Sequence, residues 1–176
     1  MMKNQKIITI LVICVVVLAL AAALTGLVAD GGPGSYDFTN LQGETVKVYG
    51  KGLYKNESLK LGPQTRGQDA VTLFLGIPLL IVSLIKSRKG SLKGRLLLAG
   101  TLGYFFYTYL MFMFIYYNPL FLVYILTMTA SLYAFILTLM SFEMGRLGRA
   151  FGPKLPIKYI VGFQFFVALT LSALWL

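Results

Sequence analysis

Histidine is absent from this sequence, and cysteine occurs once, as Cys14. Without histidine, the chain lacks the side chain that most often binds metals and most often acts as a general base. A single cysteine also rules out an intramolecular disulfide. We therefore expect no metal and no cofactor, and a non-enzymatic role is favoured over an enzymatic one.

Charged residues are scarce as well, at 12% of the chain, and only six of them are acidic. Hydrophobic residues make up 57%, more than a soluble domain of this size needs, and they lie in long blocks, as in membrane proteins. A net charge of +10 is also found in nucleic-acid-binding proteins. Here, however, the basic residues lie between apolar blocks rather than on one face, so no nucleic-acid partner is expected.

The first apolar block runs from Ile7 to Ala29, 23 residues without a charge. At about 1.5 Å per residue, a helix of this length just crosses the roughly 30 Å hydrocarbon layer. A cleaved signal peptide is the alternative, since Lys3 and Lys6 precede the block. Signal-peptide cores are shorter, however, so residues 1–29 are predicted to form a retained anchor helix.

Residues 30–69 differ in composition and are rich in glycine, proline and polar side chains. Val46 and Val48 alternate with polar neighbours, and Gly50 and Gly52 follow, which predicts one or two short β-strands joined by a turn. Forty residues are too few for an independent core. We therefore expect this loop to pack on the ends of the membrane helices.

Residues 70–176 are predicted to form a four-helix membrane bundle. Asp69 is suited to cap the first of these helices, Pro78 should kink it, and Asn118-Pro119 predicts a tight turn between two antiparallel helices. The final "SALWL" has no polar flank, so the chain is expected to continue past it. The predicted helices span residues 70–85, 96–117, 120–141 and 159–176.

The distribution of charge predicts the orientation of the chain. With the N-terminus inside, the inner segments hold eleven of the sixteen basic residues and one of the six acids, Glu143. This agrees with the positive-inside rule, and "KSRKGSLKGR" at residues 86–95 becomes a cytoplasmic turn. The predicted fold is therefore an all-α integral membrane protein of the cell membrane. It is a five-helix transmembrane bundle with a small β-containing extracytoplasmic loop and a cytoplasmic N-terminus.

Small residues recur four apart in the apolar blocks, a spacing that lets a neighbouring helix approach closely. Packing within one bundle is favoured over a dedicated oligomer interface, and the oligomeric state stays open. A bulkier side chain at such a site, as in Gly103→Leu, is expected to overpack the bundle. The pairs are Ala22 and Gly26, Ala99 and Gly103, Ala130 and Ala134, and Ala168 and Ser172.

The predicted helices contain no Asp, Glu, Lys, Arg or His, which argues against proton pumps, ion-coupled carriers and membrane hydrolases. Among the remaining polar groups, Tyr104, Tyr107 and Gln164 are candidates to line a cavity for a small ligand or lipid. Hydrogen bonding between helices is the favoured alternative.

A second set of candidates should lie together at the extracytoplasmic membrane face, where it could receive a polar ligand. The favoured alternative is structural: the tyrosines form an aromatic belt, the aspartate is a helix cap and the asparagine belongs to a turn. The set comprises Arg66, Asp69, Tyr116, Tyr117 and Asn118.

Three stretches carry a resemblance to known proteins: "RGQDAVTLFLGIPLLIVSL", "GSLKGRLLLAGTLGYFFYTY" and "YNPLFLVY". With them, roughly residues 45–140 resemble a group of uncharacterised bacterial multi-pass membrane proteins that have no assigned activity. The resemblance implies a shared topology only, and it implies further helices beyond the end of this chain.

The leading functional hypothesis is a non-enzymatic accessory or sensing subunit whose partners are the lipid bilayer and another membrane protein. The alternative is a substrate-binding transport subunit for a small, mostly apolar solute, with its site near the kinked helix. A cavity above about 300 Å³ lined by Tyr104, Tyr107 and Gln164 would favour transport. Co-purification with a larger partner would favour the accessory role.

Overall fold

The computed structural model describes residues 4–40, 43–143, 145 and 156–175. It is mostly helical (72%), with five helices in the described part of the chain and a small two-stranded sheet. Three of these helices are long and apolar enough to cross a membrane: Gln5–Val28, Leu61–Arg88 and Phe121–Met140. The chain divides into two compact units, Met1–Ser141 and Phe142–Leu176, which are described separately below.

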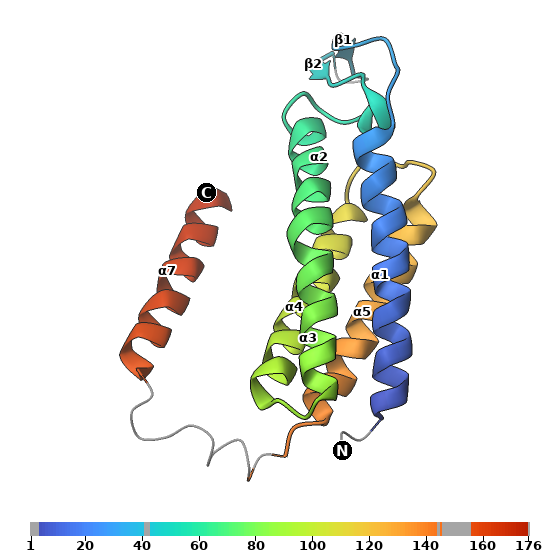
Figure 1. Ribbon diagram of the computed structural model, residues 1–176. Coiled ribbons are helices and arrows are strands. Elements are labelled where there is room, and N and C mark those ends of the chain that lie inside the picture. Colours follow the sequence, from blue (N-terminus) through green and yellow to red (C-terminus); the bar gives the residue numbers. More distant parts are fainter. Residues whose placement is uncertain (1–3, 41–42, 144, 146–155, 176) are drawn as a thin grey trace. The chain divides into compact units, whose positions relative to one another are not determined.

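The first unit packs four helical rods side by side (Figure 1). The second rod is continuous, because its two α-helices are joined through a π-helical turn, η2. The elements are α1 (Gln5–Val28), α2 (Leu61–Val71), η2 (Thr72–Gly76), α3 (Ile77–Arg88), α4 (Leu92–Phe112) and α5 (Phe121–Met140).

The predicted helices at residues 7–29 and 120–141 match α1 and α5 closely. The third predicted helix, 96–117, is α4, which begins four residues earlier and ends five residues earlier than predicted. The connection between α4 and α5 is therefore residues 113–120, longer than the tight turn predicted at Asn118-Pro119. The α4 helix begins where Ser91 caps it, since the Ser91 side chain accepts a hydrogen bond from the Gly94 N–H at 3.2 Å. α4 is not among the three helices apolar enough to span by composition. Its two basic residues, Lys93 and Arg95, and its glycines, threonines and tyrosines lower its hydropathy, and nine of its residues are buried.

The predicted start of the second membrane helix is wrong. The helix begins at Leu61 rather than at Ala70, so Asp69 lies inside it and does not cap it. Pro63 is compatible with this position because it occupies the first turn, where a missing N–H needs no partner. The helix also continues through Pro78, and the π-helical turn comes directly before that proline, where regular hydrogen bonding is disturbed.

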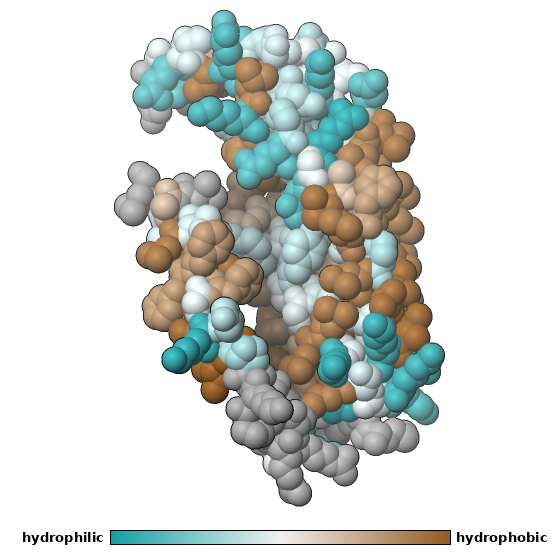
Figure 2. Space-filling view, turned by 60° about the vertical axis from the view of Figure 1, so that its left-hand side comes forward, coloured by the Kyte–Doolittle hydropathy of each residue, from teal (hydrophilic) through white to brown (hydrophobic). Residues whose placement is uncertain are grey.

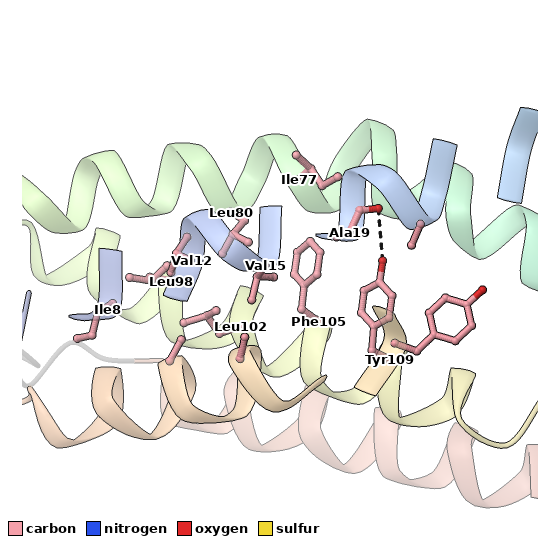
Figure 3. Packing of buried hydrophobic residues seen from close by; sticks show 14 of the residues in the cluster. Ile8, Val12, Val15, Ala19, Ile77, Leu80, Leu98, Leu102, Phe105 and Tyr109 are labelled. Carbon is pink, nitrogen blue, oxygen red and sulfur yellow. Dashed lines mark hydrogen bonds between the residues drawn. The ribbon is translucent and has the colours of Figure 1, made fainter. Parts of the chain in front are cut away.

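The centre of the first unit is filled with apolar side chains (Figure 3). α1 contributes a stripe at every third or fourth position, Ile8, Val12, Val15 and Ala19, each fully buried. α4 faces this stripe with a second buried set, Leu98, Leu102, Phe105 and Tyr109. The Tyr109 hydroxyl donates a hydrogen bond of 3.5 Å to the Ala19 carbonyl, which links the two helices.

The predicted short strands are confirmed as β1 (Tyr36–Thr39) and β2 (Thr45–Val48), an antiparallel pair. The sheet lies at the opposite end of the first unit from the N-terminus (Figure 1). Gly50 follows β2 with φ at 67°, and a Cβ atom there would lie 1.8 Å from the Gly34 carbonyl oxygen. This close approach of two backbone segments explains the glycine that the sequence places after the strand.

The opposite end of the first unit collects basic residues. Lys6 of α1 and Arg88 of α3 line one shallow surface pocket, so these two helix ends are neighbours. Arg95 donates a hydrogen bond of 2.9 Å from its Nη1 to the Ser141 carbonyl at the end of α5. Figure 2 shows hydrophilic side chains in teal over the sheet and hydrophobic side chains in brown along the helices below it. Four of the predicted inner basic residues, Lys3, Arg146, Arg149 and Lys154, lie outside the described residues.

The second unit contains α7 (Ile157–Trp175), which matches the predicted helix at residues 159–176. Its segment Ile157–Thr170 is apolar but shorter than the three candidate spans. Gln164 lies on this helix and is exposed.

Candidate functional site

A carboxylate buried inside the second helix is the most unusual feature of the first unit. Asp69 is 1% exposed, and its Oδ2 accepts a hydrogen bond of 2.6 Å from the Tyr54 hydroxyl. Its other oxygen, Oδ1, is buried and has no hydrogen-bond partner in the described structure. The prediction that no ionisable side chain lies inside the helices is therefore wrong.

Tyr54 reaches Asp69 from a short segment between the sheet and the second helix. We call residues 49–59 the cap segment; they include the 3₁₀ turn η1 (Gly52–Tyr54). Backbone hydrogen bonds anchor the segment, since the Gly52 N–H donates to the Gly31 carbonyl at 2.8 Å and the Leu59 N–H to Lys47 at 2.9 Å. Burial raises the pKa of the Tyr54 phenol, and the nearby carboxylate of Asp69 raises it further. Tyr54 therefore stays a proton donor in this contact.

Gly26 of α1 makes the contact between Tyr54 and Asp69 sterically feasible. A Cβ atom at this position would lie 1.9 Å from Asp69 Oδ2 and 2.8 Å from the Tyr54 hydroxyl oxygen. The residue one turn earlier, Ala22, is also small and fully buried. The spacing of Ala22 and Gly26 thus serves the approach of a polar pair to α1, in addition to ordinary helix packing.

Aromatic rings from α4 and α5 surround the pair. Tyr54 meets Phe112 edge to face with ring centroids 6.4 Å apart, and Phe112 meets Tyr124 at 5.2 Å. Tyr109 lies 5.9 Å from Tyr124. The Asp69 carboxylate lies close enough to Tyr109 and Tyr124 to interact electrostatically with both. The site is therefore one carboxylate within a cluster of tyrosines, a group of weak acids and hydrogen-bond donors.

Glu57 is a second buried carboxylate, at the outer edge of the same cluster. It belongs to the cap segment, is 1% exposed, and its Oε1 accepts a hydrogen bond of 2.5 Å from the Tyr116 N–H. Burial raises the pKa of Glu57, and the hydrogen bond from Tyr116 lowers it by less. Glu57 joins the cap segment to the connection between α4 and α5, as Tyr54 joins it to the second helix.

The raised pKa of Glu57 predicts how stability depends on pH. Folded Glu57 holds its proton more tightly than unfolded Glu57, whose pKa is about the ordinary 4.5. The free energy of unfolding should therefore fall as the pH rises from 4.5 through the raised pKa. Melting temperatures of wild type and Glu57→Gln in detergent, measured between acidic and neutral pH, check this. The substitution should flatten the slope. Equal slopes in the wild type and Glu57→Gln would contradict the prediction.

Apart from Asp69 itself, two of the residues singled out in the sequence make contacts around this site. Arg66 donates a hydrogen bond of 2.7 Å from Nη2 to the Leu27 carbonyl of α1. The Tyr104 hydroxyl accepts a hydrogen bond of 2.7 Å from Gln68 Nε2 and lies 3.1 Å from Thr72 Oγ1. Tyr104 therefore takes part in hydrogen bonds between helices, and Arg66 holds the second helix against α1 beside Asp69.

The other candidates are not brought together. The rings of Tyr116 and Tyr117 are 66% and 76% exposed, and Tyr107 is 52% exposed. Asn118 is buried, and its Oδ1 accepts a hydrogen bond of 2.9 Å from the Leu120 N–H, as expected for a turn residue. Gln164 belongs to the second unit.

Sequence reasoning did not assign Tyr54 or Glu57 to a site, and it identified Gly26 only as a helix-packing residue paired with Ala22. Only one sequence pattern could have indicated the site. This is the run "LGPQTRGQDAV", if it is interpreted as a helix instead of a loop. In that case Asp69 would have been an ionisable residue within a membrane helix, which is a functional hypothesis by default.

Two recesses lie apart from Asp69. One is a cleft of about 350 Å³ at the sheet, lined by Tyr36, Phe38, Val46, Lys47, Val48, Asn56, Ser58 and Tyr116. The other is an apolar groove of about 340 Å³ along the second rod and α4, lined by Val71, Leu75, Gly76, Leu79, Leu96, Leu97, Gly100, Thr101 and Tyr104. Among the described residues, no three His, Cys, Asp or Glu side chains lie close enough together to hold a metal ion.

No family model matches the chain, and neither a curated protein nor a solved structure is significantly similar to it. The resemblance of residues 45–140 to multi-pass membrane proteins therefore brings no family and no activity. Functional inference rests on the residues themselves, above all on the buried pair of Tyr54 and Asp69.

Proposed function

We propose that this protein is a multi-pass integral membrane protein that acts as a non-enzymatic sensing or accessory subunit. In this proposal α1, the second rod, α4, α5 and α7 cross the cell membrane. The N-terminus and the basic end lie in the cytoplasm, while the sheet and cap segment lie outside. The gathering of Lys6, Arg88 and Arg95 at one end supports this orientation.

The observation that carries the sensing role is the hydrogen bond between Tyr54 and Asp69. It joins a segment outside the rods to a carboxylate within one of them, over a separation of 15 residues. Ionisable side chains inside membrane helices are costly and are usually retained for function. A change at the cap segment therefore has a direct physical route to the packing of α1 and the second rod.

The filled centre of the first unit favours sensing over transport. Val15, Leu102 and Phe105 are fully buried in one apolar cluster. Tyr109 and Tyr124 belong to the same cluster and extend it toward the cap segment. A transport subunit needs a polar or open route near the middle of the membrane. Close packing there suits a protein that passes on a conformational change rather than a solute.

Cysteine labelling tests the orientation. In a Cys14→Ser background, Thr45→Cys on the sheet should react with a membrane-impermeant maleimide in intact cells. Lys89→Cys in the turn after α3 should react only after the cells are opened. Both positions are exposed, whereas Ser87 in the last turn of α3 is 1% exposed and would label poorly on either side. Labelling of position 89 in intact cells would overturn the topology.

Co-purification tests the subunit role. A tagged chain extracted from its native membrane in mild detergent should bring down one membrane protein in a fixed ratio. If the cap segment passes a signal to that partner, Tyr54→Phe should weaken the association, because it removes the hydroxyl that contacts Asp69. Tyr107→Phe makes the same chemical change at a half-exposed ring and should not. A single-component particle from native membranes would contradict the subunit role.

The second candidate function is substrate binding for transport of a small, mostly apolar solute, and one observation favours it. The apolar groove, at about 340 Å³, lies just above the lower end of the volume range of ligand sites, about 300 Å³, and it includes Tyr104. Neither Tyr107 nor Gln164 lines it. Gly100→Leu, which should fill the groove, distinguishes the two: it should abolish binding of an apolar fluorescent probe if the groove is a solute site and leave co-purification unchanged.

A further inference from the structure

We propose that Asp69 is a proton-binding site exchanging with the extracytoplasmic side, and that its proton keeps the cap segment docked on the bundle. The signal sensed would then be the pH outside the cell. This inference rests on the proposed sensing function, and it identifies the ligand that the protein senses as a proton.

The surroundings of Asp69 leave its charge uncompensated. The groups that face it are Tyr54 from the cap segment, Gly26 from α1, Tyr109 from α4 and Tyr124 from α5. All four are uncharged at neutral pH. Arg66, one turn earlier on the same helix, donates to the Leu27 carbonyl, and no lysine or arginine among the described residues forms an ion pair with Asp69. An ionised carboxylate in such a place has one hydrogen bond and no counter-ion.

A proton is the ligand that fits this site best. Gly26 already touches the carboxylate so closely that a single added carbon would lie 1.9 Å from Oδ2. A metal ion or an amine needs several ligands and a space of its own, and neither recess described above includes Asp69. Protonation requires no extra volume. It also removes the charge that burial makes costly, and it gives Oδ1 or Oδ2 a hydrogen to donate.

The cap segment is the element that must move for the proton to exchange. Tyr54 covers Asp69 directly, and Glu57, three residues later, lies between this contact and the connection after α4. When Asp69 loses its proton, water can reach the new charge most easily by displacement of Tyr54. The cap segment should therefore be docked at acidic pH and should open as the pH rises.

Distance measurement between spin labels tests this proposal. Labels at Lys55→Cys on the cap segment and Leu122→Cys on α5, in a Cys14→Ser background, occupy exposed positions of the first unit. In nanodiscs the distance distribution should be narrow at acidic pH and should broaden toward longer distances at alkaline pH. Asp69→Asn imitates the protonated acid and should stay narrow throughout. Glu57→Gln, which leaves Asp69 intact, should keep a pH response.

Two outcomes overturn the proposal: a wild-type distribution that does not change with pH, or an Asp69→Asn protein that responds as wild type does. If Asp69→Asn fails to fold, infrared difference spectra of the wild type and of Glu57→Gln decide the matter. A carboxylic-acid C=O band that titrates in both supports the site, and its absence in Glu57→Gln contradicts it. If a partner co-purifies but the distance distribution does not change with pH, the proton site is refuted and the subunit role is not. A pH response in a protein that purifies without a partner would refute the subunit role alone.

Discussion

Replacing Gly26 with alanine is expected to destabilise the first unit by on the order of 1–3 kcal/mol, the usual cost of overpacking a filled interior. The added methyl group would lie 1.9 Å from Asp69 Oδ2, so either α1 or the carboxylate must move. Movement of the Asp69 carboxyl group also breaks its hydrogen bond with Tyr54, and a typical hydrogen bond contributes about 0.5–1.5 kcal/mol. The overpacking and the loss of this hydrogen bond both lower the stability of the first unit.

Gly103→Ala is the matched control for this substitution. The same change on α4 would place a Cβ atom 3.7 Å from the Phe135 ring, an ordinary contact. Alanine is also preferred over glycine in a helix by roughly 0.5–1 kcal/mol, so this variant should be as stable as the wild type or more stable. Equilibrium unfolding in mixed micelles compares the two. Equal stabilities of Gly26→Ala and Gly103→Ala would mean that α1 does not approach the Tyr54–Asp69 pair closely.

Replacing Phe105 with alanine is expected to cost about 3 kcal/mol, at the lower end of the range for buried aromatic residues. Phe105 is fully buried, stacks on Tyr109 at a centroid distance of 6.4 Å, and meets Tyr104 edge to face at 5.5 Å. Lipid chains are as apolar as the ring, so the loss comes from packing contacts rather than from exclusion of water. The substitution leaves a cavity beside Gly76 of the second rod, against which the Phe105 ring packs.

Phe114→Ala removes the same ring from a position that is 78% exposed, beyond the end of α4. It should change the free energy of unfolding by no more than about 0.5 kcal/mol, as surface substitutions do. Unfolding of both variants under one condition checks the difference. A loss of similar size in the two proteins would show that Phe105 does not lie in a filled centre.

The helices of the first unit were largely predictable because apolar runs and charge are local features. The start of α5, for example, follows from the turn at Asn118-Pro119. The start of the second helix was not predictable, because Gly62, Pro63 and Gly67 lower both the hydropathy and the helix propensity of this stretch. Packing of this stretch against α1 and the cap segment outweighs that local preference.

The candidate site could be predicted only in part. Arg66 and Asp69 were identified as polar residues near one membrane face, but Asp69 was assigned to a helix cap. Its partner Tyr54 is 15 residues away in a loop, and the contact depends on Gly26 of a third element. Nothing in the spacing distinguishes Gly26 from Gly103. Only the tertiary arrangement shows that one glycine accommodates a buried carboxylate and the other an ordinary ring contact.

A double-mutant cycle on Tyr54 and Asp69 tests the central claim most directly, namely that these side chains join the cap segment to the bundle. Tyr54→Phe, Asp69→Ala and the double variant would be unfolded in mixed micelles at acidic pH, and their free energies compared with the wild type. Residues in direct contact are expected to give a coupling energy of about 0.5–3 kcal/mol, and we predict a value of at least about 1 kcal/mol. Additivity within about 0.3 kcal/mol, the behaviour of independent sites, would contradict the account.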